Sequence, residues 1–411
     1  MYPKDKILKS VNIQSDFLTT LLYLSFIVFS NNSTGVFVMI GLIILILVIN
    51  IIGGNTNLHI HFGRFHEYML LFGLFSLTSA LWAIKPHYAI EKGLTIFELL
   101  ICFSVLYSLY YKASIERLVK IIMWAGFILS IYTIMFYGIQ GLQSTVNDES
   151  RIENSFANVN VIGMVCCTSI LICAYLSHYK ISYIQILFCI PCLFVVAASG
   201  SRKASVILVL GLIYLFWPKQ SHKKNRKSSF FKKIWMTLII IILLYIIVQS
   251  NIFGGVMLRM DGLIASVTGV GDVDNSSMVR SYFRVIGFKQ LLETPIFGIG
   301  MGNARILAYA GTGLDCYLHC NYAELAANGG IIGLVLFYWI YIPIIKTEKK
   351  YRKTDKYATL ILILTVITLV NDYGTVSYYS KYYYFLIMVV ILHINKLKQK
   401  KNNEKNLLPT S

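Results

Sequence analysis

The segment GGIIGLVLFYWIYIPIIKTEKKYRKTDK, residues 329–356, joins an apolar run to a strongly basic block. The apolar part, residues 329–345, contains no charged residue and is close to the length of about 20 residues with which a helix crosses a bilayer. Loops on the cytoplasmic side of a membrane carry an excess of Lys and Arg. The segment therefore predicts a transmembrane helix whose carboxyl end faces the cytoplasm.

The rest of the chain repeats this pattern. Of its 411 residues, 56% are hydrophobic and 14% are charged, and the mean hydropathy is +0.65, which excludes an ordinary soluble domain. The apolar runs do not alternate with a period of two, so helices are favoured over a transmembrane barrel. We expect an all-α polytopic membrane protein with about twelve transmembrane helices, at residues 18–30, 36–52, 68–84, 94–110, 119–139, 159–176, 181–198, 204–217, 234–250, 329–345, 357–370 and 382–394.

The distribution of Lys and Arg predicts the orientation. With the amino terminus inside, every strongly basic block lies on the cytoplasmic side, including KQSHKKNRKSSFFKK (residues 219–233) and KTEKKYRKTDK (residues 346–356). The net charge of +18 is then mainly a topology signal and indicates contact with the inner leaflet, not a nucleic-acid partner. We expect a multi-pass protein of the cytoplasmic membrane with both termini in the cytoplasm and an uncleaved first helix.

Cysteine usage indicates neither a metal site nor a redox pair. Six of the eight cysteines fall inside predicted helices, where they act as small apolar residues. Only Cys316 and Cys320 lie outside them. Their spacing permits a disulfide, but two free thiols are the favoured interpretation.

This topology leaves one long loop on the outer face. It divides the chain into residues 1–250 with nine helices, the extracytoplasmic loop 251–328, and residues 329–411 with three helices and a basic tail. Loops of this length are usually functional or disordered. The stretch SSMVRSYFRVIGFKQLLET, residues 276–294, argues against disorder, because it reads as a capped amphipathic helix stopped by Pro295.

Arg280 and Arg284 lie four residues apart in that helix, so their guanidinium groups share one face. Two such groups suit a multiply charged anion such as a diphosphate, because guanidinium binds phosphate oxygens in a bidentate manner. A pair of solvated arginines on an exposed helix is the alternative. After the helix, Gly298, Gly300 and Gly302 predict a tight turn, since no preceding strand supports a dinucleotide-binding loop.

Further basic residues and a histidine face outward in the predicted topology. Arg151 precedes the sixth helix, and Arg202 and Lys203 lie in the turn AASGSRKAS between the seventh and eighth. An Arg at a helix end in a membrane is costly and points to function. His319 is a candidate general base, because the unperturbed pKa of histidine is about 6.5. An interfacial anchor is the alternative role for this histidine.

Five segments, taken together in order and spacing, resemble the superfamily of O-antigen polymerases and O-antigen ligases. They are SALWAIKPHYAI (residues 79–90), SRIENSFANVNVIGM (150–164), ASGSRKASVILVLGLIYLF (198–216), RSYFRVIGFKQLLETPIFGIGMGNA (280–304) and LHCNYAELAANGGIIGLVLF (318–337). Members of that superfamily move a glycan from a polyprenyl diphosphate to an acceptor hydroxyl outside the cytoplasmic membrane. The resemblance therefore implies a membrane glycosyltransferase whose active site is extracytoplasmic.

The resemblance also implies roles for individual residues. Arg202 matches the outward arginine near the diphosphate, Arg280 and Arg284 the loop-helix arginines, and His319 the family's histidine. Asn158 and Asn160, preceded by Arg151, resemble the asparagine-rich start of the sixth helix. Cys320 stands where family members often have asparagine, and asparagine follows at Asn321. We expect His319, Arg280, Arg284 and Glu324 to be catalytic and the remaining candidates to bind substrate: Arg151, Asn158, Asn160, Arg202, Lys203, Asn303 and Asn321.

In this interpretation, Glu324 orients the imidazole or binds sugar hydroxyls, and arginines replace a metal ion, so no cofactor is expected. The partners are the lipid-linked donor and acceptor and the bilayer, with a chain-length regulator as a further candidate. A polymerase is favoured over a ligase, and a twelve-helix flippase is the non-enzyme alternative. The tyrosines of DYGTVSYYSKYYY, residues 372–384, are interpreted as an interfacial belt, with sugar stacking as the alternative.

Overall fold

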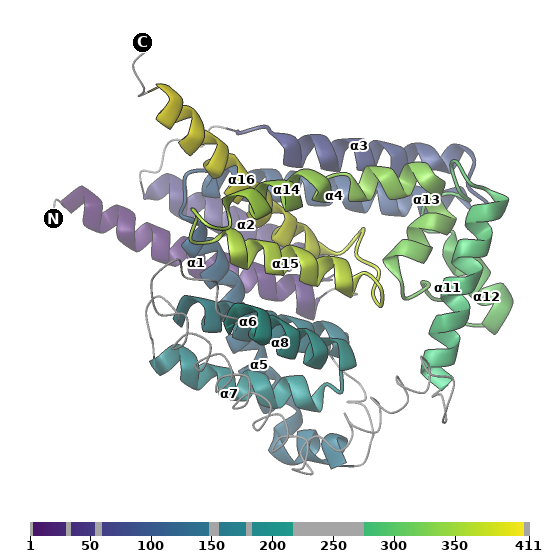
Figure 1. Ribbon diagram of the computed structural model, residues 1–411, viewed down its shortest axis with the longest axis horizontal. Coiled ribbons are helices and arrows are strands. Elements are labelled where there is room, and N and C mark those ends of the chain that lie inside the picture. Colours follow the sequence, from purple (N-terminus) through teal and green to yellow (C-terminus); the bar gives the residue numbers. More distant parts are fainter. Residues whose placement is uncertain are drawn as a thin grey trace, which may run out of the picture. The chain divides into compact units, whose positions relative to one another are not determined.

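The computed structural model describes residues 3–29, 34–53, 60–147, 156–177, 183–216 and 275–406. In this part of the chain every regular element is a helix (Figure 1). The helices are α1 (Pro3–Val28), α2 (Thr34–Ile52), α3 (Arg64–Thr78), the 3-10 helix η1 (Ser79–Leu81), α4 (Pro86–Tyr110), α5 (Ile115–Asn147), α6 (Val159–Ser177), α7 (Tyr183–Ala198), α8 (Arg202–Phe216), α11 (Asn275–Glu293), α12 (Ala304–Thr312), α13 (Asn321–Tyr338), α14 (Tyr341–Tyr351), α15 (Ala358–Asn371) and α16 (Lys381–Asn406).

The all-helical class is confirmed for the described residues. Each predicted transmembrane segment coincides with helix, except residues 234–250, which lie outside the described part of the chain. The predicted loop helix is also present as α11. Several boundaries differ: α1 begins at Pro3 and α4 at Pro86, both before the predicted starts at residues 18 and 94, and α16 ends at Asn406, after the predicted end at residue 394. In addition, α13 begins at Asn321, so the last eight residues of the predicted loop, 321–328, belong to a helix.

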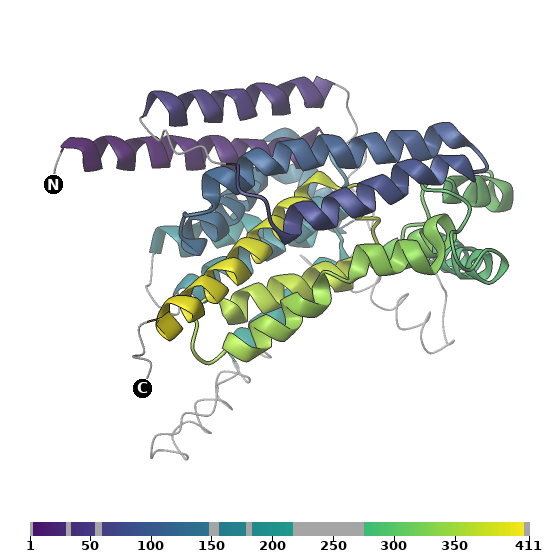
Figure 2. The same ribbon diagram turned by 90° about the horizontal axis from the view of Figure 1, so that it is seen from above.

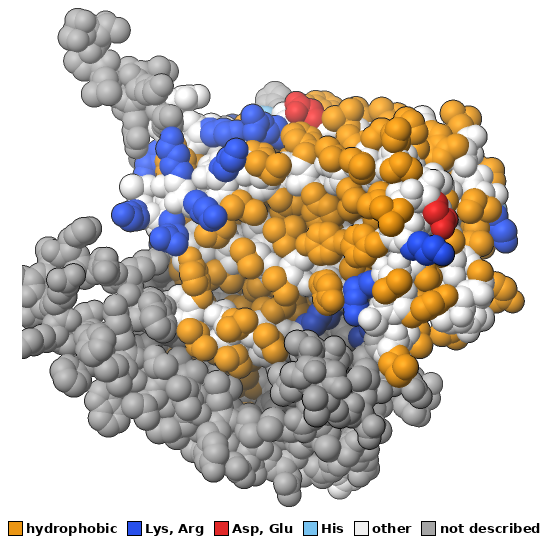
Figure 3. Space-filling model, turned by 45° about the vertical axis from the view of Figure 1, so that its right-hand side comes forward, with side chains coloured by type: hydrophobic (Ala, Val, Ile, Leu, Met, Phe, Trp, Pro, Cys, Tyr) orange, Lys and Arg blue, Asp and Glu red, His pale blue; other side chains and the backbone are white. Residues whose placement is uncertain are grey.

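Six helical segments among the described residues are long and apolar enough to cross a membrane: Val11–Val28, Gly35–Ile52, Pro86–Tyr110, Ile115–Leu142, Val159–Ser177 and Asn321–Tyr351. Shorter apolar helices cover Tyr183–Ala198, Lys203–Leu215 and Ala358–Asn371. Many large hydrophobic side chains on these helices are exposed; Phe37 and Ile52 of α2 are 76% and 80% exposed. On the face that Figure 3 shows, hydrophobic side chains dominate the described surface; several Lys and Arg side chains lie at the left, and others at the lower centre and right. These features indicate a multi-pass membrane protein.

The chain forms two compact units. The first comprises Met1–Leu18, Val36–Leu118 and Asp274–Ser411, and the second Thr19–Gly35 and Val119–Val273. In the second unit, α6 packs against α7 and α8. In the first, α3 packs against α4, and α11 packs against α13. Figures 1 and 2 show α11 and α12 at the end of the first unit where α13 begins.

A break in α13 organises the first unit. Gly330 has φ 59° and ψ −154°, outside the helical region. In a continuous helix the N–H groups of Ile331 and Ile332 would donate to Ala327 and Asn328. Here they donate instead to the carbonyls of Pro295 and Ile296, at 2.8 and 3.2 Å.

The carbonyls released by this break are also satisfied. Ala327 and Asn328 accept hydrogen bonds from the N–H groups of Ile299 and Gly300, both at 2.9 Å. The loop of residues 294–303, which we call the glycine loop, thus takes over both interrupted helix bonds. Because buried backbone groups must be paired, this exchange holds the loop in the break. The tight turn predicted from the spacing of Gly298, Gly300 and Gly302 is confirmed, since all three have positive φ.

The glycine loop also joins α13 to the connection between α3 and α4. The N–H of Met301 donates to Ser79 Oγ at 3.0 Å, and the N–H of Ile84 donates to the carbonyl of Ile299 at 3.2 Å. The indole N–H of Trp82 donates to the carbonyl of Phe297 at 3.2 Å. Segments more than two hundred residues apart in sequence are therefore fixed by hydrogen bonds.

Replacing Gly330 with Ala should destabilise the protein. A Cβ at this position would lie 2.5 Å from the carbonyl oxygen of Ile296, and the positive φ is unfavourable for any L residue. Strained backbone of this kind costs about 1–3 kcal/mol. We expect the thermal unfolding midpoint of the purified protein in detergent to fall.

Gly41→Ala in α2 is the matched control, because a Cβ on Gly41 would meet no other atom within 4 Å and the site is helical. This variant should unfold at or above the wild-type temperature. Equal midpoints for the two variants would contradict the role assigned to the break.

Candidate active site

The candidate site lies where α11, α12 and the first turns of α13 meet. A buried cluster of mostly small residues joins these helices: Phe283, Ala304, Ala308, Leu318, Cys320, Ala323 and Ala327. Gly287 of α11 lies directly against Ala323 and Leu318, where a Cβ would come within 2.9 Å of Ala323. Close helix packing therefore fixes α11 against the loop 313–320.

Arg280 and Arg284 project from α11 one turn apart, as predicted. Both are partly exposed. The guanidinium carbon of Arg284 lies 4.8 Å from the ring centroid of Tyr373, which belongs to the connection between α15 and α16. This stacking holds one arginine in place while its N–H groups retain the ability to donate to a ligand.

His319 lies at the end of the loop that precedes α13. Its φ of 55° is the only positive value of a residue other than glycine in the described part of the chain. Its imidazole lies 4.3 Å from the ring of Tyr317 and 6.1 Å from the ring of Phe283, measured between centroids. Such backbone conformations cost about 1–3 kcal/mol and cluster at functional sites. The protein therefore holds this histidine in an unfavourable conformation beside the helix that carries both arginines.

Glu324 fixes the loop that carries His319. Its carboxylate is 2% exposed and accepts a hydrogen bond from the N–H of Leu318 at 2.8 Å. It also accepts one from the Asn328 amide at 3.1 Å, and Asn328 Oδ1 accepts one from the N–H of Ala304 at 2.6 Å. This geometry assigns Glu324 to positioning the loop, in place of the predicted contact with imidazole or sugar.

Asn321 likewise has a structural environment. Its side chain is fully buried, and Oδ1 accepts hydrogen bonds from the N–H groups of Ser377 and Tyr378 at 2.9 and 3.1 Å. Its Nδ2 donates to the hydroxyl of Tyr338 at 2.8 Å. The N–H of Asn321 donates to the carbonyl of Asp372 at 2.7 Å. The residue therefore ties the start of α13 to the α15–α16 connection, and the substrate contact expected from the sequence stays a prediction.

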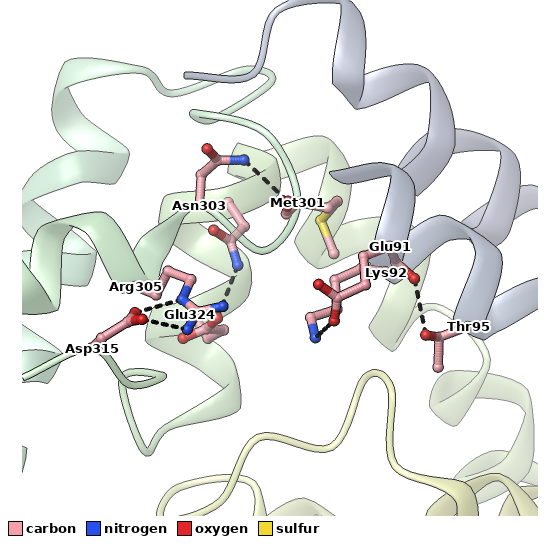
Figure 4. A network of polar contacts seen from close by, with 9 residues as sticks. Glu91, Lys92, Thr95, Met301, Asn303, Arg305, Asp315 and Glu324 are labelled. Atoms are coloured by element: carbon pink, nitrogen blue, oxygen red, sulfur yellow. Dashed lines mark hydrogen bonds and ion pairs between the residues drawn. The ribbon is translucent and has the colours of Figure 1, made fainter. Parts of the chain in front are cut away.

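Asn303 is also buried, and it joins the glycine loop to the start of α4. Its Oδ1 accepts from the N–H of Lys85 at 2.7 Å, and its Nδ2 donates to the carbonyls of Met301 and Lys85 at 3.1 and 3.3 Å. These bonds give Asn303 a structural role, and its predicted substrate contact stays a prediction. Figure 4 shows Asn303 near Arg305 and Glu324.

The other predicted binding residues belong to the second unit. Asn158 precedes α6, and its Oδ1 accepts a hydrogen bond from the N–H of Asn160 at 3.0 Å. Arg202 is the first residue of α8 and Lys203 the second. The turn before α8 packs on α6, because a Cβ on Gly163 would lie 3.3 Å from Ser201 Cβ. The structure thus brings the start of α6 and the Arg202 turn together, whereas Arg151 lies outside the described residues.

A family model described as O-Antigen ligase matches residues 187–338. The match supports the O-antigen ligase and polymerase superfamily. It confirms the resemblance stated from the sequence, and the matched residues run from α7 to the end of α13 with Arg280, Arg284 and His319 among them. Members of this family are membrane glycosyltransferase-like enzymes acting on lipid-linked glycans. No curated protein matches the chain.

Cys316 and Cys320, which lie in the matched segment, are free thiols, as predicted. Burial raises the pKa of Cys320, and burial followed by the charges of Glu324 and Asp315 raises the pKa of Cys316. Since a thiol must lose its proton to become a nucleophile, neither cysteine is activated for attack at neutral pH. His319 therefore remains the candidate base of this segment.

The tyrosines near residue 380 correct another expectation. Tyr378, Tyr383 and Tyr384 are fully buried, whereas an interfacial belt would lie on the surface. The hydroxyls of Tyr338 and Tyr383 donate to Asp372 Oδ2 at 2.8 and 3.1 Å. These tyrosines form a buried polar network around Asp372, a residue that the sequence analysis did not select. The sequence feature that could have identified Asp372 is the position of an acidic residue directly after an apolar helix.

Asn321→Ala should reduce stability more than it changes substrate affinity. The substitution leaves the buried N–H groups of Ser377 and Tyr378 without their acceptor, at about 1–3 kcal/mol for each unsatisfied group. We expect a lower unfolding midpoint in detergent. The matched control is Asn402→Ala, at an exposed position of α16. A normal midpoint combined with weaker donor binding would restore the predicted substrate role.

Proposed function

We propose that this protein is a metal-independent glycosyltransferase that polymerises polyprenyl-diphosphate-linked repeat units into surface polysaccharide. The reaction takes place on the outer face of the cytoplasmic membrane, and both termini lie in the cytoplasm. The single observation that carries the proposal is the position of α11: its two arginines lie one turn apart, beside the strained His319, inside the segment that matches the O-antigen ligase model.

The contacts around α11 support a shared site. Phe283, between the two arginines in sequence, stacks with the His319 imidazole at an interplanar angle of 11°. Arg284 lies close enough to Cys320 for its charge to influence that thiol, and Cys320 is the neighbour of His319. An anion bound by the arginines would therefore lie close to the imidazole.

The proposed reaction is displacement at the anomeric carbon of the donor glycan. A hydroxyl oxygen of the acceptor sugar forms the new bond to this carbon, while the bond from the carbon to the diphosphate oxygen breaks. The diphosphate leaves with the bonding electron pair, and His319 accepts the hydroxyl proton. Arg280 and Arg284 stabilise the charge that develops on the leaving group. The substrate-binding roles expected of Arg202 and Lys203, which belong to the second unit, stay predictions. Glu324 and Asn321 position the loop.

A polymerase and a ligase share this donor chemistry and differ in the acceptor. We favour the polymerase, in which the acceptor is another lipid-linked repeat unit, with a chain-length regulator as a further proposed partner. Ligase-type transfer to a different surface acceptor is the second candidate, because the matching family model is described as O-Antigen ligase. Deleting the gene separates them: loss of the polymerase leaves single repeat units, whereas loss of a ligase leaves long unattached polymer.

Replacing Arg280 or Arg284 with Ala should weaken donor binding by about tenfold or more, because hydrogen bonds to charged groups contribute about 1.5–3 kcal/mol. Arg284→Lys should recover little, since lysine lacks the bidentate geometry. Binding of purified lipid-linked repeat unit would be measured in detergent. Lys289→Ala is the matched control, because Lys289 lies on α11 but is 73% exposed and paired with Glu293. Wild-type affinity in both alanine variants would remove the diphosphate-binding role.

His319→Ala should reduce turnover by about 10²–10⁴-fold, the usual contribution of a general base, with little change in donor affinity. Polymer formation would be followed with the purified protein in the presence of a chelator, which also tests the metal-independent mechanism. Tyr309→Ala, at a 61% exposed position of α12, serves as the control. Unchanged turnover in His319→Ala would exclude the histidine as the base.

A further inference from the structure

A cluster of cations, tyrosines and carboxylates lies beside His319, on the opposite end of the α15–α16 connection from Arg284. This connection, residues 372–380, carries Tyr373, which stacks on Arg284 at 4.8 Å. It also carries Tyr379, whose ring centroid lies 4.5 Å from Lys92 Nζ. One short segment thus contacts an arginine of the proposed donor site and a lysine of α4.

Lys92 is held in place on several sides. Its ammonium pairs with Glu91 at 3.0 Å, and its side chain is 20% exposed. The glycine loop lies against its stem, because a Cβ on Gly302 would be 3.1 Å from Lys92 Cγ. Lys92 therefore occupies a defined position between the glycine loop and Tyr379.

Arg305 of α12 adds a second ion pair. Its guanidinium carbon lies 4.7 Å from the ring centroid of Tyr88, one helical turn before Lys92 on α4. It donates to both carboxylate oxygens of Asp315, at 2.6 and 2.7 Å. Figure 4 shows Glu91 and Lys92 on α4 facing the side of the molecule that carries Arg305 and Asp315.

The charge balance of this cluster differs from what a diphosphate requires. Lys92 and Arg305 each have a carboxylate partner, so these two pairs are together close to neutral. Lys85, whose Nζ lies 5.8 Å from the ring centroid of Tyr88, adds one positive charge beside them. Glu91 and Asp315 are 57% and 55% exposed, so their oxygens can accept further hydrogen bonds. Both donors and acceptors are thus presented next to aromatic rings. A sugar ring matches this combination, because it carries hydroxyls at its edge and apolar C–H groups on its faces.

The cluster reaches the candidate base through Tyr317. The ring of Tyr317 lies 4.3 Å from the His319 imidazole. The Tyr379 hydroxyl lies within electrostatic range of Tyr317, Glu91 and Arg305. A sugar held by the cluster would therefore lie near Tyr317, whose ring contacts the His319 imidazole.

We propose that Lys92, Tyr379, Tyr88 and the Arg305–Asp315 pair form the acceptor subsite, which binds the terminal sugars of the acceptor glycan. This assignment rests on the proposed function and adds to it the part of the site that selects the acceptor. The α11 arginines bind the charged leaving group, and the cluster, whose Lys92 and Arg305 are paired with carboxylates, binds the sugar that attacks.

The test uses two substrates that can be varied separately. The donor is the lipid-linked repeat unit isolated from the host; because a polymerase also accepts this molecule as acceptor, the donor KM is measured with the alkyl glycoside in saturating excess. The acceptor probe is the same oligosaccharide on a simple alkyl chain, which lacks a diphosphate and therefore cannot act as donor. The full-length protein in detergent is assayed for release of polyprenyl diphosphate and for elongation of the alkyl glycoside.

We expect Lys92→Ala and Tyr379→Ala to raise the KM for the alkyl glycoside about tenfold, as for loss of one specific contact, with an unchanged KM for the donor. Lys92→Gln, which keeps the aliphatic stem, should behave like Lys92→Ala. Tyr379→Phe should remain close to wild type, because it keeps the ring. The matched controls are Lys289→Ala and Tyr309→Ala, and thermal unfolding verifies that each variant is folded.

Two results would overturn the assignment: an unchanged KM for the alkyl glycoside in folded variants, or an equal rise in the donor KM, which would place the donor glycan on the cluster. These two results can be told apart from a failure of the proposed function. If the wild-type protein releases no polyprenyl diphosphate and extends no acceptor, the reaction itself is excluded and the subsite with it. If the wild type is active and the variants match it, only the subsite is excluded.

Discussion

The structure of the first unit depends on the two helix hydrogen bonds that α13 gives up at Gly330. The glycine loop accepts from Ile331 and Ile332 and donates to Ala327 and Asn328, so that no helix bond is lost without replacement. In a membrane protein this matters more than in water, because an unpaired backbone group in hydrocarbon costs several kcal/mol. A loop can enter the break only if its own backbone is in register with the missing bonds, and the positive φ of Gly298 and Gly300 provides that register.

This exchange determines where the candidate catalytic residues lie. The glycine loop follows α11, which carries Arg280 and Arg284, and the broken helix follows His319. Fixing the loop to the helix therefore fixes α11 relative to the histidine. The carboxylate of Glu324 and the amide of Asn321 then hold the backbone on either side of His319 in its strained conformation. Strain at a site of this kind persists only when its surroundings determine the backbone on both sides.

The sequence was sufficient to predict the helices, the amphipathic α11 and the glycine turn, because each depends on local periodicity or backbone freedom. The sequence was not sufficient to predict where α13 begins. Hydropathy marks only the apolar run that begins at Gly329, so the more polar residues 321–328 were assigned to a loop. Residue type also gave no indication of the structural contacts of Asn303, Asn321 and Glu324. These side chains have the chemistry of substrate contacts, but their partners are backbone groups far away in sequence. Burial of the tyrosines around Asp372 likewise depends on tertiary packing.

Lys92 shows why the acceptor side was missed. The segment SALWAIKPHYAI, residues 79–90, was selected by resemblance alone. Lys92, two residues after its end, belongs to no distinctive local sequence pattern. Its significance arises from Tyr379, nearly three hundred residues later, and from the glycine loop beside its stem. A polymerase must bind two similar lipid-linked glycans in different roles, and their chemical difference at the reacting centre is charge: the donor loses a diphosphate and the acceptor offers a hydroxyl. In the proposed reaction, two subsites of different charge near one base would distinguish the donor from the acceptor.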